Sequence, residues 1–137
     1  MKIVADTNVV ISGLLWHGAP RKVLDLAQAR QITLYTSPAL LAELQDVLGR
    51  RKFAERLHGV GVTSKYLSLR YVSLAHVIHP KTIERIVPND PDDDIVLACA
   101  LAANAEVIVS GDSHLKNLGL YRNIAILDAN QFLERFK

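Results

Sequence analysis

Short apolar runs alternate along the chain with longer segments in which apolar residues recur at helical spacing. Residues 3–5 and 107–109 are unbroken apolar runs of strand length, which are typical of strands buried on both faces of a parallel sheet. Residues 32–35, 76–79 and 124–127 are further expected strands. This alternation predicts one doubly wound domain over residues 1–137, a three-layer α/β/α fold with a parallel five-stranded sheet.

Helices are expected between these strands. Start signals such as Ser37-Pro38, in which a capping residue precedes a proline, mark several of them. The expected helical segments are 7–16, 20–29, 37–48, 63–75, 95–103 and 114–118, with a last helix capped by Asp128. Residues 58–61, His-Gly-Val-Gly, are expected to form a loop.

Composition and charge narrow the class of protein only slightly. The chain has 137 residues, half of them hydrophobic, which is enough for one domain with its own core. No apolar run has the length of a membrane span and the start does not resemble a secretory signal, so a cytoplasmic protein with no membrane contact is expected. The net charge of +2 permits a nucleic-acid partner without requiring one. The single cysteine, Cys99, lies in an apolar helix and is expected to be buried.

Carboxylates stand where two expected strands end. Asp6 follows the first strand and Asp112 follows the apolar run 107–109. If these strands are parallel neighbours, both side chains emerge at the carboxyl edge of the sheet, where open α/β sheets hold their ligands. A second group of acids, Asp90, Asp92, Asp93 and Asp94, precedes the apolar helix 95–103. One or two of these have an ordinary alternative role as helix caps.

Glu43 is the fourth candidate. Residues placed at 100° intervals put Glu43 at the edge of the apolar arc of helix 37–48, beside Val47, whereas Asp46 falls nearly opposite and is expected to be solvated. Several carboxylates held close together repel one another unless cations join them, and oxygen ligands suit Mg²⁺ or Mn²⁺. Such a site favours phosphodiester hydrolysis. The five histidines have no zinc-ligand spacing.

A basic run follows helix 37–48. It contains Arg50, Arg51, Lys52 and Arg56. These side chains are candidates for contact with RNA phosphates, and the alternative is a solvated helix face without a ligand.

Four motifs together resemble the PIN-domain nucleases, and more narrowly the PIN-type toxins of bacterial toxin-antitoxin modules. They are V-A-D-T-N at 4–8, the Ser37-Pro38 helix with Glu43, D-P-D-D at 90–93 before L-A-C-A, and V-S-G-D at 109–112 followed by His114-Leu115. The resemblance covers nearly the whole chain. It implies a PIN fold, a metal-dependent endoribonuclease, an RNA substrate, a cognate antitoxin and a homodimer.

The resemblance also implies a catalytic and metal-binding quartet of acids. By position these are Asp6, Glu43, Asp93 and Asp112, with Asp94 and Asp90 as alternates for the third acid. Thr7, Asn8 and Ser110 resemble the small polar residues that flank the metal in the family, and their alternative role is to cap a helix or end a strand.

Other classes of function fit less well. An aspartyl phosphotransfer enzyme usually needs a second Asp two residues after the first, and this chain has Asn8 there. A phosphorelay receiver needs paired N-terminal acids and a phospho-acceptor in mid-chain, which the sequence lacks. The stronger alternative is a catalytically weak or inactive PIN-fold module that binds RNA or protein. The presence of all four acids favours the enzyme.

Overall fold

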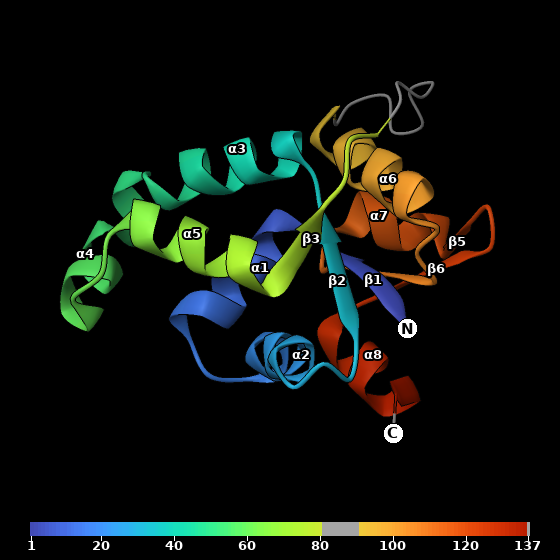
Figure 1. Cartoon of the computed structure of the whole chain (residues 1–137), viewed down its shortest axis with the longest axis horizontal. Helices are drawn as coiled ribbons and strands as arrows, with labels where there is room; N and C mark the ends of the chain where they lie inside the picture. Colours follow the sequence, from blue (N-terminus) through green and yellow to red (C-terminus); the bar gives the residue numbers. More distant parts are fainter. Residues whose placement is uncertain (81–90, 137) are drawn as a thin grey trace.

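One mostly parallel sheet forms the centre of the computed structural model, which describes residues 1–80 and 91–136, without the side chains of 91–93 (Figure 1). The strand order is β3-β2-β1-β4-β6-β5. The strands are β1 (Lys2–Ala5), β2 (Thr33–Thr36), β3 (Ala75–Val77), β4 (Val107–Val109), β5 (Leu120–Tyr121) and β6 (Ile124–Leu127). The pairs from β3 to β6 are parallel, and β5 pairs antiparallel with β6.

The sixth strand corrects the predicted five-stranded sheet. β5 has two residues and is joined to β6 by Arg122 and Asn123, which adopt φ values of 47° and 68°. Two consecutive left-handed residues are the backbone of a tight hairpin turn. A two-residue strand carries no periodicity, so the apolar pattern does not reveal it.

Helices cover both faces of the sheet, as the α/β pattern predicts (Figure 1). One face packs against α1 (Thr7–Leu15), α2 (Ala19–Gln28), α5 (Ser64–Leu74) and α8 (Ala129–Phe136). The other packs against α6 (Pro91–Ala103) and α7 (Ser113–Leu118). Burial from both sides explains why Ile3, Val4 and Ala5 are all apolar, since each is 3% exposed or less.

A helical arm, α3 (Pro38–Leu48), α4 (Arg51–Val60) and α5, extends from the sheet (Figure 1). Ser37 caps α3 by accepting a hydrogen bond from the backbone N–H of Leu40 at 3.2 Å. The loop expected at 58–61 is wrong for three of its residues, because α4 continues through Val60 and ends at Gly61, whose φ is 72°. Gly59 therefore lies within the helix, and the glycine that ends it is the second one.

Two arginines cap the C-terminal end of α1. Arg21 donates from Nε to the carbonyl of Gly13 at 2.7 Å and from Nη2 to that of Leu14 at 3.1 Å. Arg56, on α4, donates from Nε to the carbonyl of Leu15 at 2.9 Å, and its guanidinium lies 5.3 Å from the ring of Trp16. The last carbonyls of a helix have no partner within it, so both guanidiniums stabilise the end of α1.

In the described ranges 1–80 and 91–136, every helix is too short or too polar to cross a membrane.

Replacing Arg56 with alanine is expected to destabilise the fold. The change removes charge-assisted hydrogen bonds to the carbonyl of Leu15, and such bonds contribute about 2 kcal/mol each. Urea unfolding measures the loss. The exposed neighbour Arg51, changed to alanine, serves as the control and should alter stability by less than about 0.5 kcal/mol. Equal effects of the two changes would contradict the capping role of Arg56.

Candidate active site

The carboxyl ends of β1 and β4 lie side by side and carry the central acids. Ala5 is paired with Val109, so the next residues, Asp6 and Ser110, are direct neighbours. The backbone N–H of Asp6 donates to the carbonyl of Val109 at 3.0 Å, which continues the ladder past the last paired residues. The expected parallel pairing of the strands that precede Asp6 and Asp112 is confirmed.

Asp6 is buried, with 6% of its surface exposed, and its two oxygens have different partners. Oδ1 accepts a hydrogen bond from the backbone N–H of Val9 at 2.9 Å, so Asp6 is the N-cap of α1. Oδ2 accepts a hydrogen bond from the hydroxyl of Ser110. The carboxylate is therefore oriented by one donor from α1 and one from the end of β4.

Ser110 connects Asp6 to Asp112. Its Oγ donates to Asp6 and accepts a hydrogen bond from the backbone N–H of Asp112 at 3.0 Å. Asp112 in turn caps α7, because its Oδ1 accepts from the backbone N–H of His114 at 2.8 Å and of Leu115 at 3.3 Å. Within the described residues, the capping hydrogen bonds of Asp112 and its contact with the ring of His114 all use Oδ1.

Burial raises the pKa of Asp6 above its usual range. The hydrogen bonds from Ser110 and Val9 act in the opposite direction, and the negative charge of Asp112 raises the pKa further. The two carboxylates therefore interact electrostatically. A cation beside them favours their ionised forms.

The other predicted acids lie on neighbouring elements. Glu43 is on the second turn of α3, which starts at the carboxyl end of β2; the residue is partly buried and its Oε2 is fully so. Asp94 is partly buried near the start of α6. Asp90 lies outside the described residues, and so does the side chain of Asp93. The choice between Asp93 and Asp94 stays a prediction.

The supporting polar residues take different positions. Thr7 is 6% exposed, and its Oγ1 is buried without a hydrogen-bond partner among the described residues. Asn8, the next residue of α1, is exposed. Ser110 is fully buried, directly follows β4 and donates a hydrogen bond to Asp6, so its role at the strand end is confirmed and its role beside a metal stays a prediction.

The residues present fit a hard divalent cation in their chemistry. Oxygen atoms shielded from solvent, namely those of the Asp6 carboxylate, Oε2 of Glu43 and Oγ1 of Thr7, are the ligands that such an ion prefers. Within the described part of the chain, no three acidic, histidine or cysteine side chains converge closely enough to hold an ion. The side chain of Asp93 lies outside that part, so the expected quartet remains a prediction.

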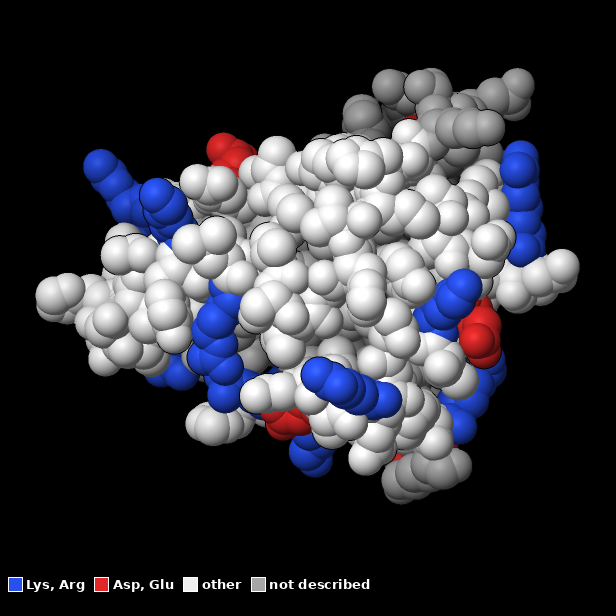
Figure 2. Space-filling view, in the orientation of Figure 1, with Lys and Arg blue, Asp and Glu red and all other residues white. Residues whose placement is uncertain are grey.

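The four basic candidates divide into two kinds. Arg56 is occupied by the end of α1, and Arg50 forms an exposed ion pair with Asp46 at 3.2 Å. Arg51 and Lys52 are exposed at the start of α4, and Figure 2 shows basic side chains projecting at the end of the arm. Contact of these four side chains with RNA phosphates stays a prediction.

The two hydrophobic cores contain a buried hydroxyl group, on Tyr71, and a buried thiol group, on Cys99. Tyr71 of α5 is 2% exposed, and its hydroxyl has no hydrogen-bond partner among the described residues. Its pKa is raised by burial and then by the charges of Cys99 and Asp6. Cys99 is fully buried, as expected, and burial raises the pKa of its thiol to about 12. Tyr71 lies four residues after the buried Leu67, and this helical spacing is the signal that could have identified it.

Comparison with known proteins decides the family. A sequence profile of the PIN domain matches residues 2–114. The chain belongs to the PIN-domain family. PIN domains are generally nucleases and generally use divalent metal ions.

Individual proteins that are similar to this PIN domain match it over most of its length. An uncharacterized protein of Methanocaldococcus jannaschii is 32% identical over 135 residues, covering 98% of this chain and 80% of the relative. The crystal structure of VapBC2 from Rickettsia felis, bound to a DNA fragment from their promoter, superposes with a TM-score of 0.63 at 17% identity, covering 93% of this chain and 98% of the other. The T. brucei RRP44 PIN domain gives a TM-score of 0.47 at 18% identity, covering 97% of this chain and 79% of the other.

Replacing Asp6 with asparagine is expected to stabilise the metal-free fold at neutral pH. Because folding raises the pKa of Asp6 above 3.8, ionisation of Asp6 opposes folding; the penalty is absent below pH 3.8 and grows as pH rises through the folded pKa. The gain should be on the order of 1 kcal/mol, the size of one relieved like-charge interaction, and should vanish at low pH. Thermal melts in EDTA across this pH range measure it.

The exposed Asp46, changed to asparagine, is the control and should alter stability by less than about 0.5 kcal/mol. A loss of stability in the Asp6→Asn variant at neutral pH would show that its hydrogen bonds outweigh its charge.

Proposed function

We propose that this PIN domain is a divalent-metal-dependent endoribonuclease that hydrolyses phosphodiester bonds in RNA. The observation that carries the proposal is the chain of contacts from the buried Asp6 through the buried Ser110 to the partly buried Asp112, at the ends of adjacent parallel strands. Capping of α7 explains why an acid is present at Asp112. It does not explain why a second carboxylate, that of Asp6, is buried beside it. Membership of a nuclease family supports the same function.

The residues of this edge have separable roles. Asp6 and Asp112 would hold the ion, with Glu43 and either Asp93 or Asp94 completing the set. Mg²⁺ or Mn²⁺ bound here supplies Lewis-acid activation of water and stabilises negative charge on the phosphate. Ser110 and the N–H of Val9 orient Asp6 before any ligand arrives, so the carboxylate needs little rearrangement to bind one.

The basic surface of the arm supports RNA as the substrate. Arg51 and Lys52 are exposed on α4, and neither is engaged in an ion pair within the described residues. Exposed cations attract phosphates and raise the rate of encounter with RNA. Arg50 and Arg56 contribute charge to this surface while remaining tied to Asp46 and Leu15.

We further propose that the protein is the cytoplasmic toxin of a toxin-antitoxin module, with a cognate antitoxin and a homodimeric state. The shared fold with the Rickettsia felis VapBC2 protein supports this assignment. Exposed apolar side chains on α5, Tyr66, Leu69 and Val72, are 37–61% accessible and suit a protein partner.

Amide substitutions test the acids one at a time. Asp6→Asn, Glu43→Gln, Asp93→Asn and Asp112→Asn should each reduce RNA cleavage by about three orders of magnitude or more, because each removes a charged metal ligand. Asp46→Asn is the matched control, exposed on the same helix as Glu43, and should leave the rate unchanged. Cleavage rates on a labelled single-stranded RNA measure both. A much larger effect of Asp94→Asn than of Asp93→Asn would move the third ligand by one residue.

Metal removal and product ends distinguish the enzyme from a binding module. Cleavage should require Mg²⁺ or Mn²⁺, cease in EDTA, and leave a 5′-phosphate and a 3′-hydroxyl, because attack by water needs no 2′-oxygen. End-group analysis of the products measures this. Full activity in EDTA, or a cyclic phosphate product, would reject the metal mechanism. RNA binding without cleavage at any metal concentration would favour the non-catalytic module.

A further inference from the structure

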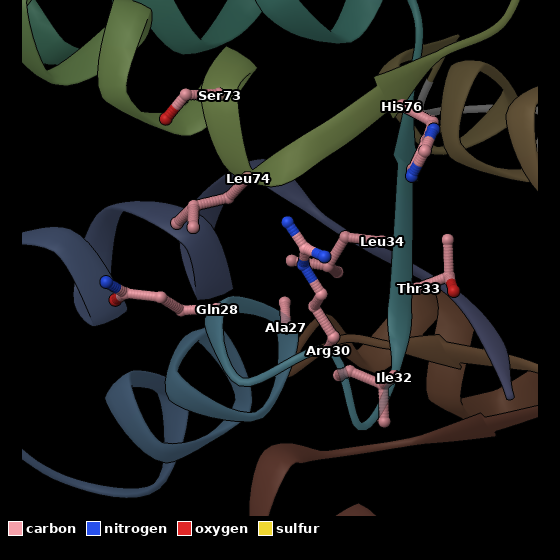
Figure 3. Close-up of a pocket in the computed structure, with 9 residues that line it drawn as sticks. All are labelled: Ala27, Gln28, Arg30, Ile32, Thr33, Leu34, Ser73, Leu74 and His76. Atoms are coloured by element: carbon pink, nitrogen blue, oxygen red, sulfur yellow. The ribbon is translucent and has the colours of Figure 1, made fainter.

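A hollow of about 500 Å³ lies at the opposite edge of the sheet from the acids (Figure 3). It is bounded by the last turn of α2, the last turn of α5 and the amino end of β2. The apolar part of its floor is formed by the half-buried Leu74 together with Ala27 and Ile32, which are 9% and 4% exposed, whereas Leu34 is fully buried. Volumes of this size accommodate small organic ligands.

Arg30 points into this hollow. Figure 3 shows its guanidinium between Leu34, Leu74 and Ala27, whereas the side chains of Thr33 and His76 lie across β2. The ring of His76 packs 5.5 Å from that of Tyr35, a residue of the other core, which accounts for its direction. Arg30 is thus the cationic side chain that faces the apolar floor.

The backbone of Arg30 is held in a conformation that suits glycine better. Its φ is 61°, and it ends α2 by donating from its backbone N–H to the carbonyl of Ala27 at 3.0 Å. Glycine is the usual residue at this left-handed position after a helix. The backbone of Arg30 is therefore strained. In this conformation its guanidinium lies over the floor of the hollow.

The surroundings add two guanidiniums and one carboxylate. A smaller adjoining hollow shares Gln28 and Leu74 and is lined by Arg70, Arg21 and Asp25. Arg21 is bound to carbonyls of α1, whereas Arg30 and Arg70 have no ion-pair partner within the described ranges 1–80 and 91–136. Two unpaired guanidiniums beside an apolar floor match an anion that carries an apolar or aromatic group.

We propose that this hollow, called here the Arg30 groove, binds a nucleotide. Its phosphate would lie against Arg30, with Arg70 adding charge, and its base would cover Leu74 and Ala27. A phosphate ion alone makes no use of the apolar floor, and an apolar ligand alone makes no use of the guanidiniums. The nucleotide can be a free mononucleotide or part of an RNA strand. The groove is separate from the carboxyl edge, so binding there is independent of the proposed nuclease activity.

The test uses the substitution Arg30→Gly. Glycine removes the guanidinium and also relieves the positive φ, so the variant should melt at or above the temperature of the original protein. Titration of 5′-AMP in EDTA, followed by calorimetry, should show affinity reduced at least about tenfold. Loss of binding together with retained stability excludes unfolding as the cause.

Arg122→Gly is the matched control. Arg122 also has a positive φ, 47°, and carries the same charge, but it lies in the turn between β5 and β6. This variant loses one charge and one strained residue, as Arg30→Gly does, and should bind 5′-AMP within about twofold of the original affinity. Equal losses in the two variants would indicate a general charge effect and overturn the proposal.

Three further ligands test which chemistry is recognised. Adenosine and inorganic phosphate should each bind the original protein at least about tenfold more weakly than 5′-AMP, because each lacks one of the two contacts. A short adenylate oligonucleotide in EDTA identifies the source: tighter binding than 5′-AMP assigns the groove to an RNA strand, and weaker binding assigns it to a free nucleotide. Adenosine binding as tightly as 5′-AMP, or no binding of 5′-AMP and the oligonucleotide, would reject the nucleotide site.

Discussion

The arrangement of two helices on the sheet depends on hydrogen bonds to one buried side chain, Asp6, at the junction of the two central strands. An ionised group in such a position is costly unless donors surround it, and here the donors come from two elements, the first turn of α1 and the end of β4. Asp6 therefore fixes the direction in which α1 leaves the sheet. Ser110 passes the same constraint to Asp112 and the start of α7. The candidate active site and the start of two helices are thus one structure.

Tight packing along α1 maintains this arrangement. A Cβ at Gly13 would lie 2.7 Å from Cδ1 of Leu24 and 2.9 Å from the carbonyl oxygen of Pro20, so a larger residue there would push α2 away. The close approach brings Arg21 within reach of the carbonyls of Gly13 and Leu14. Backbone groups at both ends of α1 thereby have hydrogen-bond partners. An acid accepts at the amino end and guanidiniums donate at the carboxyl end, in agreement with the direction of the helix dipole.

The sequence predicts those features that depend on local periodicity or on capping. Unbroken apolar runs identified β1 and β4, Ser37-Pro38 identified α3, and the acids that follow β1 and β4 indicated the edge at which they meet. Features that depend on the third dimension were missed. The bond from Arg56 to Leu15 spans 41 residues, so its sequence context indicates only a basic helix face. Arg30 gives no signal either, because its role comes from a left-handed φ that composition does not reveal.

The weak attachment of α4 affects the order in which parts of the molecule unfold. None of the residues of α4 is buried, so its attachment relies on Arg56, on Trp16 and Phe53 with ring centroids 6.3 Å apart, and on its partly buried apolar side chains. A helix without a buried face can detach at a small fraction of the cost of global unfolding. Because Arg21 still holds two carbonyls of α1 after such detachment, the strands and Asp6 keep their places. Amide hydrogens of α4 should therefore exchange with solvent long before those of β1 and β4, as a separate cooperative unit attached to the rigid carboxyl edge of the sheet.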